Sequence, residues 1–442
     1  MHARFSHTCH LFNVTVLSSS LCTMLFAARV AAGDWPQFRG PDGQGHSTEQ
    51  GLPLDWSETD NVVWKTPVAG VGWSSPVVRG RQIWLTTAIE EEGSLRAICL
   101  DAASGKIARD VELFRKPDLG PINPKNSHAS PTPYIDGDRV FVHYGAHGTA
   151  CISTRGEVLW RNEELVHDHR HGPAGSPVVW RDLVILNCDG ADQQFVVALD
   201  RNTGHIRWRT DRPSKMAYAT PLVVSFGGVD QLISPGAGQV TSYDPATGRE
   251  IWQCRHGGDS VVMRPVISDG MVFVSSGYGS TALYAFGLAS RGEVLLTDAV
   301  WTLRRGVPYD PSPLIVGDEF YLVSDQGVVS CLDLRTGKQH WQARLSGAFS
   351  ASPLECEGRI YITNEEGLTT VIEAGKKLKK LAENQVEGRT LASLATSDHA
   401  IFLRTDEYLY RIAAPQGAPR SPQPVAGRPK PTANRQVQYL KR

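Results

Sequence analysis

The sequence predicts an all-β fold, an eight-bladed β-propeller built from four-stranded antiparallel blades, and three observations lead there. A short phrase recurs along the 442 residues at intervals of roughly 40–55 residues, the period of propeller blades. Glycine (42) and proline (27) are abundant, so the chain turns often. Each repeat has room for four short strands, and because one such sheet cannot bury both faces alone, the copies must stack around an axis.

Each repeat opens with a small residue and a proline before an apolar strand. A polar turn such as Asp136-Gly137-Asp138 and a second apolar strand follow. The openings are Ser75-Pro76, Ser130-Pro131, Ser176-Pro177, Thr220-Pro221, Arg264-Pro265, Ser312-Pro313 and Ser352-Pro353, with Ser393-Leu394 as a degenerate eighth copy. Eight copies between Val62 and Ile412 favour eight blades, with seven blades as the alternative.

Each repeat ends on the phrase A-x-D-x-x-T-G-x-x-x-W or a remnant of it. The full form contains Ala198, Asp200, Thr203, Gly204 and Trp208. A large apolar ring at a fixed place in each blade is typical of packing between blades. We therefore expect four tryptophans to be structural: Trp160, Trp208, Trp252 and Trp341.

The last repeat lacks its outer strand. A segment of the matching type, Val62-Val63-Trp64-Lys65-Thr66, precedes the first repeat instead. Pairing of this segment with the strand that ends near Ile412 would close the ring and cover an exposed sheet edge.

Segments at both ends fall outside the predicted propeller of residues 62–412. Residues 1–32 have a basic start, an apolar run and the small residues Val30-Ala31-Ala32, as in a signal peptide cleaved near Ala32. Leu21 precedes Cys22, which argues against a lipid anchor. Residues 33–61 should form an irregular arm across one face, and the proline-rich basic residues 413–442 a disordered tail. We expect export to the periplasm or beyond, with no transmembrane segment.

These motifs resemble those of a known family. The closing phrase is similar to the tryptophan-docking repeat of pyrroloquinoline-quinone (PQQ) β-propellers, and Asp34-Trp35-Pro36-Gln37-Phe38-Arg39-Gly40-Pro41 resembles the start of exported PQQ-like repeat proteins. The resemblance covers roughly residues 34–412 and implies the fold. Its members include quinoprotein dehydrogenases and the non-catalytic propeller of the outer-membrane β-barrel assembly machinery, so the fold alone does not decide function.

Charge and cysteine content exclude several classes. A net charge of −1 gives no nucleic-acid footprint. The chain has no C-x-x-C, which excludes attached c-type haem and a thioredoxin-like motif. Cys99, Cys151 and Cys331 occupy the place of Ala198, so we expect buried free thiols. Cys188, predicted to lie in a loop, is the candidate reactive thiol.

Histidines gather in the loops of the second and third repeats. Loops between blades and those joining the second and third strands share one face of a propeller, so these side chains should converge. The candidate ligand site consists of His143, His147, His169, Asp189 and Asp192. Imidazole with carboxylate suits a divalent metal or proton transfer, although no fixed metal-binding spacing is present. The alternative is a solvated loop with no ligand.

The resemblance also defines what a quinoprotein would need: a vicinal disulfide, a tryptophan beneath the quinone, and Ca²⁺ held by Glu, Asn and Asp beside an Asp base. The chain has no Cys-Cys pair and no clear counterpart of the calcium set. Several polar residues fall in loops of the same face, as an anion or quinone site would require: Arg264, Arg305, Tyr278, Tyr309, Asp325 and Asn364. We expect no cofactor, with PQQ and Ca²⁺ as the alternative.

The sequence thus favours an exported, monomeric, non-catalytic propeller that binds a protein or polymer of the cell envelope. The alternative function is a quinoprotein-type oxidoreductase or a metal-assisted enzyme that uses the loop face. Whether the chain is an enzyme stays open at this point.

Overall fold

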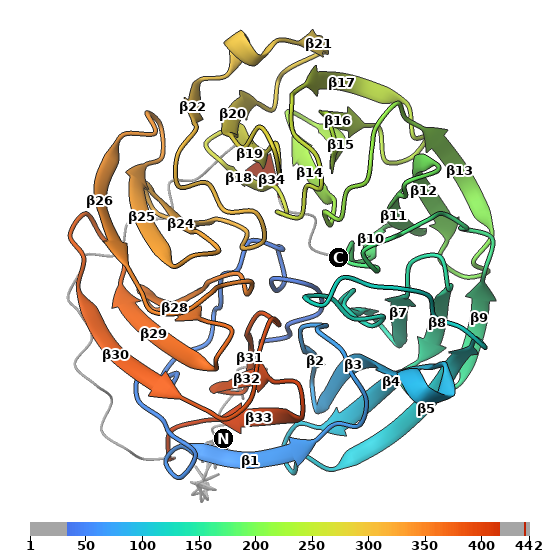
Figure 1. Cartoon of the computed structure of the whole chain (residues 1–442), viewed down its shortest axis with the longest axis vertical. Coiled ribbons are helices and arrows are strands. Elements are labelled where there is room, and N and C mark those ends of the chain that lie inside the picture. The colour runs from blue at the N-terminus through green and yellow to red at the C-terminus, as the bar shows by residue number, and fades with distance from the viewer. Residues whose placement is uncertain (1–32, 416–436, 439–442) are drawn as a thin grey trace, which may run out of the picture. The chain divides into compact units, whose positions relative to one another are not determined.

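Eight β-sheets surround a central axis in the computed structural model, which describes residues 33–415 and 437–438 (Figure 1). Every sheet has a core of four antiparallel strands, and the only helical elements of the described residues are two short 3₁₀ turns, η1 (Glu90–Glu92) and η2 (Leu296–Asp298). The eight-bladed, all-β prediction is confirmed, and the seven-bladed alternative is wrong.

The strands follow the repeat in chain order. Blade 1 contains β2 (Val77–Arg79), β3 (Gln82–Ile89), β4 (Ser94–Asp101) and β5 (Ile107–Arg115), and blade 2 contains β6 (Tyr134–Asp136), β7 (Arg139–His143), β8 (Thr149–Ser153) and β9 (Val158–Asn162). Blade 3 contains β10 (Val178–Trp180), β11 (Leu183–Asp189), β12 (Gln194–Asp200) and β13 (Ile206–Asp211). Blade 4 contains β14 (Leu222–Phe226), β15 (Val229–Gly236), β16 (Gln239–Tyr243) and β17 (Glu250–Arg255).

Blade 5 contains β18 (Val266–Ser268), β19 (Met271–Ser275), β20 (Leu283–Gly287) and β22 (Trp301–Leu303), and blade 6 contains β23 (Leu314–Val316), β24 (Glu319–Val323), β25 (Val328–Asp333) and β26 (Gln339–Arg344). Blade 7 contains β27 (Leu354–Cys356), β28 (Arg359–Thr363), β29 (Leu368–Glu373) and β30 (Lys380–Gln385). Blade 8 contains β31 (Ala395–Ser397), β32 (Ala400–Arg404), β33 (Tyr408–Ile412) and β1 (Val62–Pro67). Two further strands, β21 (Gly292–Val294) and β34 (Val437–Gln438), add to blade 4.

Burial explains the sequence pattern of the strands. The second and third strands of a blade are covered on both faces by neighbouring blades, so β19 is buried at every position and β7 at every position after Arg139, and both consist mainly of β-branched and aromatic residues. The outer strands β13 and β26 alternate between exposed and half-buried residues because one face meets solvent.

The ring is closed by its N-terminal strand. β1 pairs antiparallel with β33, with Lys65 opposite Tyr410 and Thr66 opposite Leu409. The outer strand of blade 8 therefore comes from the start of the propeller (Figure 1), as predicted.

One repeat opening lies two residues later than predicted. In the other blades with an opening proline, this proline directly precedes the first strand, as Pro76 precedes β2. In blade 2 the proline before β6 is Pro133, so the opening is Thr132-Pro133 and not Ser130-Pro131. Two Ser/Thr-Pro pairs in succession made the register ambiguous in the sequence.

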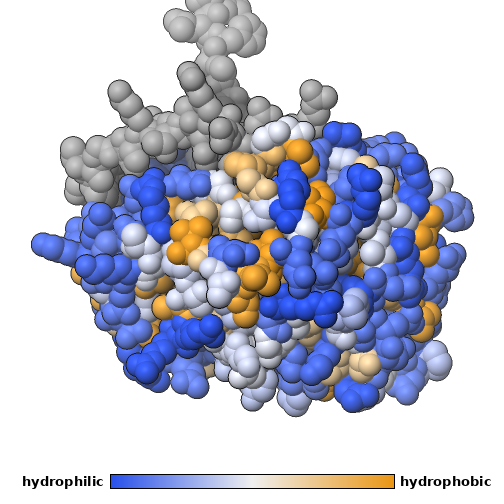
Figure 2. Space-filling model, turned by 90° about the horizontal axis from the view of Figure 1, so that it is seen from above, coloured by the Kyte–Doolittle hydropathy of each residue, from blue (hydrophilic) through white to orange (hydrophobic). Residues whose placement is uncertain are grey.

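Blade 4 has an extra strand on its outer edge. The β20–β22 connection of blade 5 crosses over and places β21 parallel to β17, with Gln253 opposite Glu293. The added strand covers the edge of β17 and leaves Leu295 and Val300 exposed. Figure 2 views this edge of the ring and shows hydrophobic residues grouped between hydrophilic ones.

No helix in the described part of the chain has the length and apolar character needed to cross a membrane.

Candidate ligand-binding funnel

A ring of hydroxyl groups surrounds the axis. The residue before the opening proline, or before Leu394 in blade 8, accepts a hydrogen bond from the backbone N–H of the corresponding residue one blade earlier, over 2.9–3.1 Å. We call the seven members the hydroxyl ring: Ser75, Thr132, Ser176, Thr220, Ser312, Ser352 and Ser393. The repeat thus has a small hydroxyl residue at its opening because that residue links adjacent blades.

Blade 5 interrupts the hydroxyl ring. Arg264 occupies the corresponding position, and its own N–H still donates to Ser312. Because an arginine has no hydroxyl, the N–H of Thr220 lacks the acceptor that its counterparts have. The Arg264 side chain instead turns away and donates to the carbonyl oxygen of Phe38 over 2.5 Å and to Oε1 of Gln37 over 2.9 Å.

The hydroxyl ring lines a cavity of about 600 Å³ on the axis, which we call the funnel. This volume suits a small molecule or the end of a chain. Aromatic side chains stand on its walls: Trp73, His171, Tyr218, Tyr278 and Tyr309. Tyr278 and Tyr309 have ring centroids 5.3 Å apart and are 61% and 37% exposed, so they form an apolar pair at the rim.

The arm of residues 33–61 closes one end of the funnel. Trp35 pairs with Val78 of blade 1, Arg39 donates to the carbonyl oxygen of Pro313 in blade 6 over 2.6 Å, and Ser47 donates its N–H to Glu355 in blade 7. Between these contacts Phe38 reaches the cavity and lines it. The arm therefore forms the floor, and access is from the loop face.

A long connection from β5 to β6 lies at the other end. We call residues 116–133 the mouth loop; its Asn123, Lys125, Asn126 and Ser130 line the funnel. Lys125 reaches blades 6 and 7, with its Nζ 2.8 Å from Asp310 and 3.0 Å from Glu365. These two ion pairs hold a blade 1 connection over the axis.

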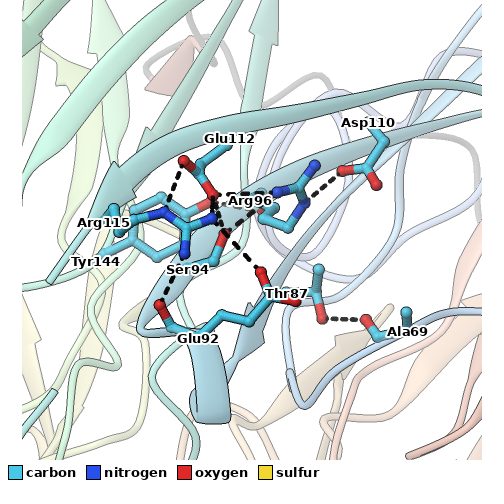
Figure 3. Close-up of polar contacts among 9 residues, drawn as sticks. All are labelled: Ala69, Thr87, Glu92, Ser94, Arg96, Asp110, Glu112, Arg115 and Tyr144. Carbon is cyan, nitrogen blue, oxygen red and sulfur yellow. Dashed lines mark hydrogen bonds and ion pairs between the residues drawn. The ribbon is translucent and has the colours of Figure 1, made fainter. Parts of the chain in front are cut away.

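The base of the mouth loop is attached to blade 1 (Figure 3). Arg115 and Arg96 both contact Glu112, and Arg115 also pairs with Glu92. Lys116 donates its N–H to Gly93 over 2.9 Å. The loop therefore leaves from a region of dense polar contacts.

The structure brings together the three histidines of the predicted site. The rings of His147 and His169 are 5.0 Å apart, and His143 accepts from or donates to Thr149 over 2.8 Å through Nδ1. Burial and the neighbouring imidazoles lower the pKa of His143 and of His169 to about 3, and burial lowers that of His147 to about 4. All three are therefore neutral near pH 7.

His128 and His167 extend this cluster and belong to the same set of loops. His128 lies 5.7 Å from His147, and His167 lies 5.7 Å from His169, centroid to centroid. His128 comes from the mouth loop, whose Asn126 also donates to the carbonyl oxygen of His171 over 2.8 Å. The histidine cluster, these five residues, thus lies beneath the mouth loop.

The two aspartates of the predicted site are engaged elsewhere. Asp189 is fully buried at the end of β11 in an ion pair with Arg212, whose Nε donates to Oδ1 over 2.9 Å. Asp192 is exposed and accepts the N–H groups of Asp168 and Gln193. Among the described residues, no group of three or more His, Cys, Asp or Glu side chains is placed to hold a metal ion.

Of the polar residues considered for a quinone, Tyr278, Tyr309 and Asp325 line the funnel, whereas Arg264, Arg305 and Asn364 do not. Burial and the neighbouring Asp310 raise the pKa of Asp325, which accepts the N–H of Tyr309 over 2.7 Å. The six cysteines of the described residues are all buried free thiols, and none lines the funnel. These side chains do not fit the disulfide-and-calcium arrangement of PQQ dehydrogenases.

Cys188 is not a loop residue, so that prediction is wrong. It lies within β11 and is fully buried, and burial raises the pKa of its thiol well above the ordinary value. The strand continues three residues farther than the sequence suggested because residues 187–189 still pair with residues 194–196 of β12. A buried protonated thiol is inert.

With the fold and funnel described, comparison with known proteins assigns the family. Residues 99–308 and 297–438 match the family described as outer membrane protein assembly factor BamB. The chain belongs to this family. The resemblance to PQQ-like propellers noted in the sequence is thereby confirmed.

Two BamB relatives match parts of the chain. The BamB of Shewanella oneidensis is 22% identical over 245 residues, 52% of this chain and 58% of the relative. That of Aliivibrio fischeri is 37% identical over 101 residues, 22% of this chain and 25% of the relative. The chain therefore spans less than two thirds of the length of either relative in these matches.

Solved structures share the fold. BamB from Moraxella catarrhalis superimposes with a TM-score of 0.57 at 14% identity, covering 79% of this chain and 99% of that one. A europium-containing methanol dehydrogenase gives 0.63 at 11% identity, covering 85% and 90%. A BamB and a methanol dehydrogenase thus both share the fold with this chain, and at these identities the likeness shows the architecture alone.

Apart from Tyr278, Tyr309 and Asp325, sequence reasoning did not identify the residues that build the funnel. The mouth loop lies outside the repeat phrase, so nothing marked Lys125 as a residue that crosses the axis. The hydroxyl ring was visible as the Ser/Thr of each opening, but we interpreted it only as a repeat marker. The exception at Arg264 was the available signal, because one arginine among seven hydroxyl residues points to a local difference.

Proposed function

We propose that this chain is an exported, non-catalytic scaffold of the cell envelope that binds a protein partner at the loop face, around the funnel mouth. The observation that carries the proposal is the exposed pair Tyr278–Tyr309 at the rim of an axial cavity whose opposite end is filled by the arm. Tyrosines that expose apolar surface beside a pocket are typical contacts of protein interfaces.

Family membership supports the envelope setting. The relatives are named as outer membrane protein assembly factors, so we infer that the partner belongs to outer-membrane protein assembly. The proposal includes the organisation read from the sequence: a signal peptide in residues 1–32, a monomeric propeller over residues 62–412 and a tail from residue 413. The signal peptide and almost all of the tail lie outside the described residues.

Site-specific photocrosslinking in cells tests where the partner binds. The photoreactive residue p-benzoylphenylalanine replaces Tyr278 at the rim, or Val63 on the outer strand of blade 8, which is 52% exposed and serves as the matched control. We expect a crosslinked outer-membrane assembly protein from position 278 only. Equal crosslinking from both positions, or from position 63 alone, would contradict the proposed face.

A deletion strain tests the proposed function in cells. Loss of the gene should lower the amount of folded outer-membrane β-barrel proteins, and the wild-type chain should restore it. Tyr278→Ala with Tyr309→Ala should restore it poorly and weaken binding of the identified partner by about tenfold or more, the loss expected for a central aromatic contact. Unchanged barrel proteins in the deletion strain would reject the assembly role.

A further inference from the structure

The hydroxyl ring presents hydrogen-bond donors that nothing in the described protein uses. Each of its seven oxygens accepts one backbone N–H. None of the seven hydroxyls donates to another described group. A serine or threonine hydroxyl carries one donor hydrogen besides its acceptor sites. Because all seven residues line the funnel, their O–H groups are available to whatever fills its inner end.

Three arginines lie beside the hydroxyl ring and are only about 1% exposed. Arg264 is itself the blade 5 residue at the ring position. Arg404 donates to the carbonyl oxygen of Ser74 over 3.1 Å, and Arg39 to that of Pro313 over 2.6 Å. Ser74 and Pro313 are each adjacent in sequence to a ring member, so these guanidinium groups lie near the hydroxyl ring, although none of the three arginines itself lines the funnel.

No carboxylate neutralises these guanidinium groups directly. Within the described residues, none of the three has an Asp or Glu oxygen within the 4.0 Å of an ion pair. Their acceptors are carbonyl, hydroxyl and amide oxygens. Burial lowers the pKa of Arg39 and of Arg404 to about 9, which still leaves both protonated at neutral pH.

Asp42 is the carboxylate with a long-range effect on Arg39 and Arg264, and it is already paired with His46. Its Oδ2 lies 3.6 Å from Nδ1 of His46, and its charge only partly offsets the burial that lowers the arginine pKa values. Positive charge in a poorly solvated place is unfavourable unless something compensates it. An anion at this end of the funnel would do so.

We propose that the inner end of the funnel is an oxyanion site that binds a carboxylate or phosphate group entering from the loop face. The hydroxyl ring supplies neutral donors in a circle, and the buried arginines supply a positive field that is strong because little water screens it. The volume of about 600 Å³ leaves room for more than the anionic group, so the ligand extends toward the aromatic rim. The inference does not depend on the proposed protein partner.

Calorimetric titration of the purified full chain tests the site with three probes. These are inorganic phosphate, the dipeptide acetyl-Gly-Tyr with a free carboxylate, and the same dipeptide as its amide, all at constant ionic strength. We expect saturable binding of phosphate, of the free-acid dipeptide or of both, with a Kd of about 1 mM or lower, and none of the amide. Phosphate alone indicates a free oxyanion as the ligand, and the acid alone indicates a chain end.

Arg264→Ser tests the charge with little disturbance of the repeat. It places in blade 5 the residue type found in the other seven openings and restores an acceptor for the Thr220 N–H. We expect at least a tenfold loss of affinity for the probe that binds. Arg249→Ser, which removes an exposed arginine on blade 4, is the matched control and should bind as the wild type does.

A second pair keeps the test decisive if Arg264→Ser weakens the fold. Thr220→Val removes the hydroxyl at nearly constant shape, and Thr220→Ser retains it. The valine variant, which also loses the acceptor of the Ser176 N–H, should bind several-fold more weakly than the serine variant at a temperature where both are folded. The inference is overturned if neither phosphate nor the free acid binds saturably, if the amide binds as tightly as the acid, or if Arg264→Ser binds like Arg249→Ser. In each of these cases, a crosslink from position 278 would still support the proposed protein partner.

Discussion

Trp160 donates its indole N–H to the carbonyl oxygen of Arg201 in the next blade over 3.0 Å, and its ring covers Gly204 of the same turn. A Cβ on Gly204 would lie 2.5 Å from the indole, and its φ of +75° also favours glycine. The Gly and Trp of the repeat phrase thus meet across adjacent blades. The indole of Trp160 therefore links two adjacent blades.

The same contact recurs around the ring. Trp208, Trp341 and Trp64 each donate to a backbone carbonyl of the following blade over 2.9–3.1 Å. Trp301 of blade 5 does so as well over 2.9 Å, although the sequence analysis did not include it. Trp252 differs because its Nε1 donates to Gln231 of its own blade and the ring is fully buried.

These environments predict an order of stability losses for tryptophan truncation. Trp252→Ala should lower the free energy of unfolding by about 3–5 kcal/mol, the usual cost of emptying a buried aromatic site. Trp208→Ala and Trp341→Ala should cost less because both rings are half-buried. Denaturant unfolding of the three variants measures the order. An unchanged midpoint for Trp252→Ala would show that this ring has no structural role.

The repeat determined much of the fold in advance, because Ser/Thr-Pro openings and T-G-x-x-x-W closings report local backbone and interblade contacts. Blade number and closure by β1 followed from counting strands. The funnel could not be derived in this way. Lys125 and Asp310 are 185 residues apart and meet only because the ring brings blades 1 and 6 to one axis.

The candidate site shows the same limit. Adjacent loops placed His143, His147 and His169 together as expected. Asp189 was grouped with them by position, but its partner Arg212 directly follows β13, and no pattern in the sequence marked that pair.

The Asp189–Arg212 pair predicts an asymmetric response to mutation. Both side chains are buried, 0% and 2% exposed, so Asp189→Ala leaves an uncompensated guanidinium and should destabilise the protein by about 3–5 kcal/mol. The double substitution Asp189→Leu with Arg212→Met removes both charges and should cost less than the single one. Chemical denaturation of both variants measures this. A double variant less stable than Asp189→Ala would show that the charges stabilise the fold outright.

The histidine cluster predicts that stability falls with acidification. The pKa values of His143 and His169, about 3, lie below the ~6.5 of an unfolded chain, so the unfolded state binds more protons between these limits. Stability from this source is complete above pH ~6.5 and is lost as the pH falls toward 3, by at most about 1.4 kcal/mol per pH unit for each imidazole.

Thermal unfolding between pH 7.5 and 4.5 measures this dependence. His143→Gln removes one titrating group and can still bond to Thr149, so its midpoint should fall less steeply than that of the wild type. His205→Gln is the control because His205 is exposed on an outer turn. Identical slopes for His143→Gln and the wild type would mean that His143 is not held neutral by its surroundings. Carboxylates titrate at the lower end of the range, so the comparison with the control is the informative one.

Lys125 predicts how the mouth loop is held. Its ammonium lies between Asp310 and Glu365, whose charges raise its pKa despite partial burial, and Glu365 also pairs with Arg389 at 3.4 Å. Lys125→Ala removes the two contacts that join the loop to blades 6 and 7. Ion pairs that are partly solvated contribute little to global stability. Lys125→Ala should therefore lower the free energy of unfolding by no more than about 1 kcal/mol, with a correspondingly small change in the thermal midpoint.

The local effect of Lys125→Ala should be larger than the global one. Amide hydrogen exchange should speed up in residues 117–131, since exchange there reports opening of the loop and not unfolding of the blades. Lys106→Ala, an exposed lysine on the β4–β5 turn, should leave the exchange of these residues unchanged. If the loop exchanges equally in both variants, its attachment rests instead on Asn126, which bonds to His171. In that case Asn126→Ala, which removes the 2.8 Å bond to the carbonyl oxygen of His171, should produce the faster exchange.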